Sequence, residues 1–163
     1  MVKFTTLINS YERMQDEQKT NLAKRDKLRV EQNKRVEEMK QLAAKLKQHT
    51  PESEAYRKTE EDLREKQAGF EAWGRVEQQK LIEEETRIIR GVYEEIERAT
   101  AEFAKKNGYV VILKEDELDL AKAAGRELKL TLALRKILYV DPSVDVTAKV
   151  LALLNKKYKS QPR

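Results

Sequence analysis

One long stretch of charged, helix-forming residues, from about residue 10 to residue 107, contains a single proline near its middle. Proline is excluded from a helix interior but suits its first turn, and the residue before it leaves the helical region. We therefore predict two helices joined at Thr50-Pro51, with Thr50 as the N-cap of the second. The second helix should end at Gly108, since glycine favours the left-handed conformation found there. At about 1.5 Å per residue the helices would be roughly 60 and 84 Å long.

The apolar and charged residues of these helices predict that the two pair with each other. Apolar residues recur in the second helix at steps of three, four and seven, and more sparsely in the first. Residues 11–48 carry a net charge of +4 (11 basic, 7 acidic) and residues 52–107 carry −4 (11 and 15), so the helices attract each other. A turn at the proline places Leu28 opposite Trp73. The pattern predicts an antiparallel hairpin with a thin apolar seam.

The end of the second helix is its most regularly apolar part. Val92, Ile96, Ala99 and Phe103 lie beyond the reach of the first helix. Apolar side chains at helical spacing need a surface to cover. We expect them to pack on a small body formed by the two ends of the chain.

The two ends of the chain contain short apolar runs. Val2 to Ile8 read as a strand, whereas the alternating leucines of residues 128–134 leave strand and helix both open. Asp145 is placed to cap a closing amphipathic helix. The strands expected to join copies of the chain consist of Val110, Val111, Ile112, Leu113, Ile137, Leu138, Tyr139 and Val140.

The predicted fold is α+β and mostly α, a long antiparallel helical hairpin on a small β-strand oligomerisation body. The body comprises residues 1–9 and 108–163, and the arm comprises residues 10–107 with its tip near 49–52. Charged residues make up 39% of the chain and aromatic residues 6%, too little apolar material for a large core. Short strands alone do not form a stable sheet in water, so we expect self-association.

The chain lacks the residues that several kinds of catalysis and ligand binding require. The chain has no cysteine and one histidine, His49, which suits the C-terminus of the first helix. No glycine-rich phosphate-binding loop occurs. We interpret the acidic runs 83–85 and 115–117 as solvated charge, and Asp145 with Thr147 as a helix cap. We predict no enzymatic activity, no cofactor and no metal site.

Membrane and nucleic-acid contacts have little support in the sequence. No apolar run approaches the roughly 18 residues of a membrane span, and the first eight residues are too short and polar for a secretory signal. Lys156, Lys157, Lys159 and Arg163 form a basic tail. We interpret it as a solvated terminus, with contact to anionic lipid or nucleic acid as the alternative. The neutral hairpin argues against nucleic acid.

Three motifs lie near the ends of the chain. They are ILYVDPSVDVT at 137–147 followed by Val150-Leu151, FAKKNGYVVIL at 103–113, and LINSY at 7–11. Together they resemble the C-terminal ending, the helix-to-strand junction and the N-terminal junction of the Skp/OmpH family of periplasmic chaperones. The resemblance covers most of the chain, although residues 115–134 form a longer segment than in the best-known members.

The resemblance implies a homotrimer with strands at its hub and three hairpins around a cavity. Unfolded outer-membrane proteins would be held in that cavity without ATP, in the periplasm, with the signal peptide absent from this sequence. Flexible thioethers and broad aromatic faces adapt to varied partners. We therefore take Met14, Met39, Phe70 and Trp73 as candidate client-binding residues, with ordinary hairpin core as the alternative.

Two other functions remain open from the residues. A structural coiled-coil scaffold would use its arms to bind one specific partner helix. A prefoldin-like cytoplasmic chaperone would share the helical arms but lack the ending at residues 137–147. The scaffold differs from a periplasmic holdase in its partner, and the prefoldin-like chaperone differs in its compartment.

Overall fold

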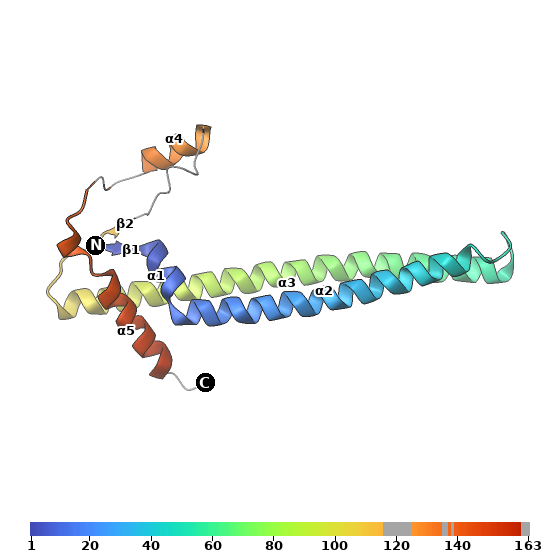
Figure 1. The fold of residues 1–163 in the computed structure, drawn as a ribbon, viewed down its shortest axis with the longest axis horizontal. Coiled ribbons are helices and arrows are strands. Elements are labelled where there is room, and N and C mark those ends of the chain that lie inside the picture. Colours follow the sequence, from blue (N-terminus) through green and yellow to red (C-terminus); the bar gives the residue numbers. More distant parts are fainter. Residues whose placement is uncertain (116–124, 135–136, 138, 161–163) are drawn as a thin grey trace. The chain divides into compact units, whose positions relative to one another are not determined.

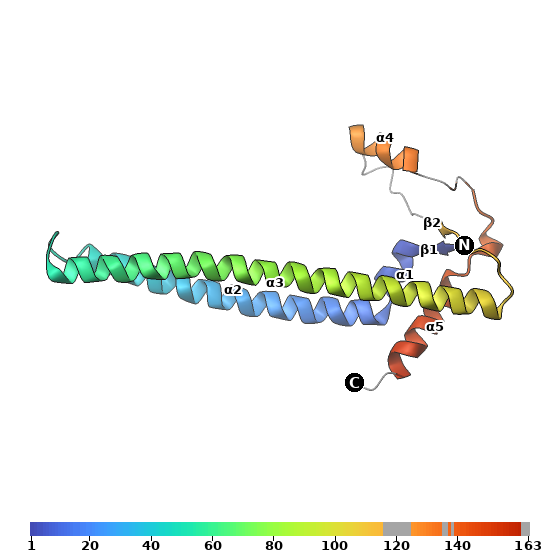
Figure 2. The same ribbon diagram turned by 180° about the vertical axis from the view of Figure 1, so that it is seen from behind.

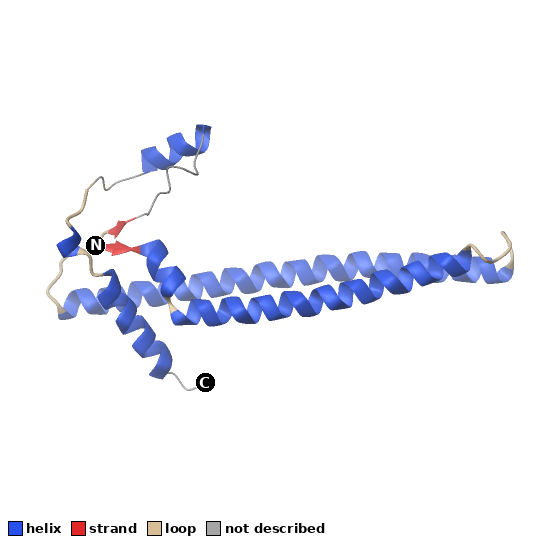
Figure 3. Ribbon diagram, viewed as in Figure 1, coloured by secondary structure: helices blue, strands red, loops and turns tan. Residues whose placement is uncertain are grey.

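The computed structural model describes residues 1–115, 125–134, 137 and 139–160. Helices dominate the fold, and the only sheet among these residues has two short strands (Figures 1 and 3). The elements in chain order are β1 (Val2–Lys3), α1 (Phe4–Ser10), α2 (Glu12–Leu46), α3 (Glu54–Lys106), β2 (Lys114–Glu115), α4 (Gly125–Leu134), the 3-10 helix η1 (Pro142–Val144) and α5 (Thr147–Ser160). This confirms the predicted α+β, mostly α fold with its long helical hairpin.

The described chain divides into two compact units. The first, the hairpin unit, comprises Lys19–Arg87, in which α2 and α3 run antiparallel side by side (Figure 2). The second, the basal unit, comprises Met1–Gln18 and the described residues from Ile88 onward. The longer helix therefore contributes to both units, with a different packing partner in each.

The turn of the hairpin is longer than predicted. Helix α3 begins at Glu54, and the Ser53 hydroxyl accepts a hydrogen bond from the backbone N–H of Tyr56 at 3.1 Å. Ser53 is therefore the N-cap, and the prediction of Thr50 was wrong. The reason is Glu52, whose φ of 68° lies in the left-handed region and prevents a helix from starting at the preceding proline.

The pairing of the two helices differs from the predicted register. Trp73 lies beneath the Arg35 guanidinium, with 4.6 Å between the guanidinium carbon and the ring centroid. The prediction paired Trp73 with Leu28, about two helical turns away. Lys24 pairs with Glu84 in the same shifted register. The longer turn moves these partners of α3 along α2.

The core of the molecule lies in the basal unit. Its buried side chains come from both chain ends and from the second half of α3. They are Val2, Leu7, Tyr11, Ile88, Val92, Ile96, Ala99, Val146, Val150 and Leu154. The apolar end of α3 thus packs on the chain ends, as predicted, with Phe103 partly buried beside it.

The N-terminal strand is shorter than predicted. Only Val2 and Lys3 are in strand conformation, and helix α1 begins at Phe4, so the strand prediction for residues 4–8 was wrong. Leu7 and Tyr11 are 0% and 1% exposed and lie four residues apart, one turn along the same face. Burial follows the helical step, and the alternation of apolar residues in this segment is incidental.

The predicted strand at residues 110–113 does not form in the single chain. Strand β2 occupies Lys114–Glu115 and pairs in parallel with β1, with Val2 opposite Lys114. Residues 109–113 are irregular, although the Leu113 carbonyl accepts a hydrogen bond from the Val2 N–H at 2.9 Å. Hydrogen bonds between strands form only where a partner strand lies alongside, and β1 supplies only two residues.

In the second predicted strand, at residues 137–140, the described residues are not in strand conformation. Ile137, Tyr139 and Val140 are irregular backbone, and Leu138 lies outside the described residues. The one sheet found among the described residues joins β1 and β2 and does not include them. The segment that the sequence left open forms α4, and residues 116–124 lie outside the described residues.

The closing helix α5 follows the prediction. The Asp145 carboxylate accepts a hydrogen bond from the Thr147 N–H at 2.8 Å, at the start of the helix. The Thr147 hydroxyl in turn accepts one from the Lys3 N–H at 2.9 Å. The cap of α5 therefore also fastens the N-terminal strand.

Candidate functional site

The seam of the hairpin unit has no dry core. No side chain of α2 is fully buried, and in α3 the first fully buried side chain is Ile88, which belongs to the basal unit. Two helices with sparse apolar residues bury only one narrow face of each other. Water therefore reaches every seam side chain of the hairpin unit.

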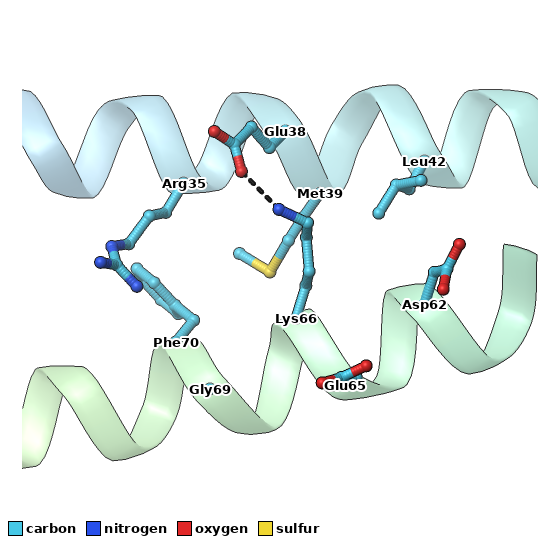
Figure 4. A pocket seen from close by; sticks show the side chains of 9 residues that line it. All are labelled: Arg35, Glu38, Met39, Leu42, Asp62, Glu65, Lys66, Gly69 and Phe70. Atoms are coloured by element: carbon cyan, nitrogen blue, oxygen red, sulfur yellow. Dashed lines mark hydrogen bonds and ion pairs between the residues drawn. The ribbon is translucent and has the colours of Figure 1, made fainter.

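A cavity of about 530 Å³ opens beside this seam (Figure 4). Met39 projects from α2 and Phe70 from α3 into the space between the helices, and both are half-buried. The wall combines apolar and charged side chains. Its lining consists of Arg35, Glu38, Met39, Leu42, Asp62, Glu65, Lys66, Gly69 and Phe70.

A second cavity of about 500 Å³ shares two of these lining residues. Met39 and Phe70 line both cavities and thus form the partition between them. The other residues of the second lining are Val36, Lys40, Ala43, Leu63, Gln67 and Glu71. A single layer of one thioether and one aromatic ring separates the two spaces.

The only tryptophan lies one turn from this partition. The rings of Trp73 and Phe70 are 5.9 Å apart between centroids and tilted by 30°. The Arg35 guanidinium covers the indole and also pairs with Glu31, at 2.7 Å from Nε to Oε1. A cation over an exposed aromatic face contributes about 0.5–1 kcal/mol. Arg35 therefore holds the indole against the seam without burying it.

The charges around the larger cavity are only partly paired. Lys66 reaches across the seam to Glu38, and its hydrogen bond lowers the pKa of that carboxyl group. Asp62 and Glu65, which lie on α3 at the cavity wall, form no ion pair with any described residue. The cavity wall therefore retains two uncompensated negative charges.

The structure brings together three of the four predicted client-binding residues. Met39, Phe70 and Trp73 lie in the hairpin unit, whereas Met14 packs against the core of the basal unit. Sequence reasoning did not propose Arg35 as part of the site. A basic residue within an otherwise apolar stripe was the available signal.

The basal unit contains a partly buried polar network. The Tyr11 hydroxyl donates to Glu95 Oε2 at 2.8 Å, and Arg13 Nη1 lies 2.6 Å from Glu95 Oε1. Burial raises the pKa of Tyr11 well above its ordinary value, and the hydrogen bond to the Glu95 carboxylate raises it further. A Cβ at Gly91 would lie 3.4 Å from Arg13 Nη2, an ordinary van der Waals contact, so the network does not require glycine there. The network joins the N-terminal residues to α3.

Exposed apolar side chains gather where the two inter-chain strands were predicted. Val110 is 98% exposed and Val111 65%, and Leu113 and Tyr139 are also exposed. The backbone of these residues is irregular. Their side chains thus remain open to a partner.

Within the parts of the chain that the structure describes, each helix is too short or too polar to cross a lipid bilayer. The same parts hold no group of three or more His, Cys, Asp or Glu side chains placed to bind a metal ion.

Comparison with known proteins identifies the family. Neither the curated proteins nor the solved structures yielded a match to the sequence. The family model described as "Outer membrane protein (OmpH-like)" matches residues 1–154 of the 163. The match spans the helical hairpin and nearly all of the described chain ends. The chain therefore belongs to the OmpH-like family.

Proposed function

We propose that this chain is an ATP-independent holdase that binds unfolded outer-membrane β-barrel proteins and prevents their aggregation. The OmpH-like family is a family of periplasmic chaperones for outer membrane proteins. The holdase acts as a homotrimer, whose hairpins surround a cavity for the client. It works without a cofactor and without catalysis, because binding alone keeps apolar segments apart.

The observation that carries this proposal is that the seam between α2 and α3 in the hairpin unit contains no fully buried side chain. A holdase must offer many weak contacts and no fixed pocket, since its clients share no single sequence. Met39, Phe70 and Trp73 are half-buried and surrounded by charged side chains. A flexible thioether and broad aromatic faces can adapt to different apolar segments.

Self-association follows from the exposed strand candidates of the basal unit. Val110, Val111, Leu113 and Tyr139 expose apolar surface that monomeric proteins normally cover. Pairing of residues 110–113 in one copy with the segment around Tyr139 in the next copy would supply the partner strand missing from the single chain. Such a contact is head-to-tail, and when its rotation closes, three copies give the smallest ring.

The proposed location is the periplasm, and the proposed partners are other copies of the chain and unfolded outer-membrane proteins. The basic C-terminal tail, with exposed Lys156 in its described part, would add attraction to an anionic lipid surface. The balanced charges of the hairpin disfavour a role in binding nucleic acid.

Aggregation of a urea-unfolded β-barrel protein on dilution tests the holdase function. We expect the purified chain to suppress light scattering at near-stoichiometric amounts of trimer, without ATP. A scaffold protein would bind one partner and leave the scattering unchanged, which would refute the proposal. Native mass spectrometry tests the trimer, expected near 57 kDa, three times the chain mass of 19.1 kDa.

A further inference from the structure

The larger cavity of the hairpin unit has an unbalanced charge. Its two basic side chains already form ion pairs, Lys66 with Glu38 and Arg35 with Glu31. Asp62 and Glu65 have no such partner among the described residues. The hairpin as a whole is neutral, so this local excess of negative charge is a property of the cavity wall.

The apolar part of the same cavity is open to an incoming side chain. Met39, Leu42 and Phe70 line it, and Figure 4 shows their side chains directed into the space between the two helices. A Cβ at Gly69 would meet nothing within 4 Å, so the backbone leaves this side of the cavity free. The volume of about 530 Å³ exceeds that of any single side chain.

We propose that this cavity binds unfolded segments in which a large apolar side chain adjoins a lysine or arginine. The apolar side chain packs on Met39 and Phe70, and the cation lies beside Asp62 and Glu65. The inference rests on the proposed holdase function and names the class of client segment that the hairpin selects. Opposite charge favours such segments over acidic ones of equal apolarity.

The second cavity provides an internal comparison. It has the same Met39–Phe70 partition, but its charged residues, Lys40 and Glu71, have opposite signs. It therefore offers apolar surface without a preference for the charge of the client. Selection of basic segments belongs to the larger cavity, and the two faces of the hairpin differ in the clients they favour.

Titration with two unfolded peptides tests the preference. They share length and apolar residues, and one carries lysines where the other carries glutamates. Methyl-labelled methionine reports the site by NMR, because the chain has only three methionines and Met39 alone lies in the hairpin unit. We expect the lysine peptide to shift the Met39 methyl resonance and to bind about fivefold more tightly than the glutamate peptide. Added salt should reduce the difference.

Charge-neutralising variants locate the preference on the cavity wall. The double variant D62N/E65Q should lose the fivefold preference. The matched control E60Q/E61Q removes two nearby carboxylates that line neither cavity and should retain it. Circular dichroism verifies that both variants keep the helical content of the wild type.

Three results would overturn the inference. The glutamate peptide binds as tightly as the lysine peptide, D62N/E65Q keeps the preference, or the Met39 resonance shifts with protein concentration alone, which would mean that another copy fills the cavity. If the chain still suppresses aggregation of the β-barrel protein, the holdase function stands and only this inference is wrong. If aggregation is not suppressed, the holdase function itself fails.

Discussion

Replacement of Tyr11 by phenylalanine tests the partly buried polar network of the basal unit. Tyr11 is 1% exposed, and its hydroxyl donates to a carboxylate of Glu95 that Arg13 also holds. A hydrogen bond to a charged group contributes about 1.5–3 kcal/mol. Because Arg13 still neutralises Glu95 in the variant, we expect the lower end, a loss of about 1.5 kcal/mol in the free energy of unfolding near neutral pH.

The pH dependence of this loss has a definite sign. The Tyr11 pKa is raised in the folded chain by burial and by Glu95, whereas in the unfolded chain the phenol ionises near pH 10. Above about pH 10 the folded state binds one more proton, so its stability falls by about 1.4 kcal/mol per pH unit. Phenylalanine cannot ionise and escapes this loss. The advantage of the wild type should therefore vanish near pH 11.

Urea unfolding followed by far-ultraviolet circular dichroism, at one fixed protein concentration, measures this effect. The difference between wild type and Tyr11→Phe isolates Tyr11, because every other group titrates in both proteins. Tyr56→Phe is the matched control, since it lies outside the proposed contact between copies and its hydroxyl forms no hydrogen bond with any described residue, and it should change stability by less than about 0.5 kcal/mol. An advantage of the wild type that is equal near pH 8 and pH 11 would refute the reasoning.

Three further substitutions test the turn, the proposed assembly and the core. Ser53→Ala removes the N-cap of α3 and should lower the free energy of unfolding of the hairpin by about 1 kcal/mol, measured by thermal circular dichroism; an unchanged melting curve would contradict the assigned cap. Val110→Asp places a charge on the exposed strand candidate and should dissociate the oligomer in native mass spectrometry while helical content is kept; an intact oligomer would place the interface elsewhere. Leu154→Ala leaves a cavity in the basal core and should cost about 2–5 kcal/mol in urea unfolding, whereas the exposed control Ala152→Gly should cost about 1 kcal/mol; equal losses would contradict the packing of α5.

The two long helices were predictable because their signals are local. Helix-forming residues, the absence of internal proline and Gly108 as the terminating residue act within a few positions of each other. The amphipathic end of α3 was equally predictable, and Val92, Ile96 and Ala99 are buried in the core of the basal unit. Periodicity reports a face that must be covered, even before the covering element is known.

The candidate site was only partly predictable. Met39, Phe70 and Trp73 stood out as large apolar residues in a charged helix, and they lie together in the hairpin unit. The role of Arg35 and the unpaired state of Asp62 and Glu65 depend on the register of the two helices. That register depends on the backbone of a short turn, in which one left-handed residue moves the start of α3.

The amino-acid sequence by itself determined the hairpin, its two charged helices and the apolar end of α3, because helix formation and amphipathic periodicity depend on residues close together in the chain. Tertiary structure decided the register of the seam, the conversion of residues 4–8 into helix, and the absence of strands at residues 109–113. These outcomes depend on partners distant in sequence. A strand forms only where another strand meets it, and no local pattern specifies whether that partner is available.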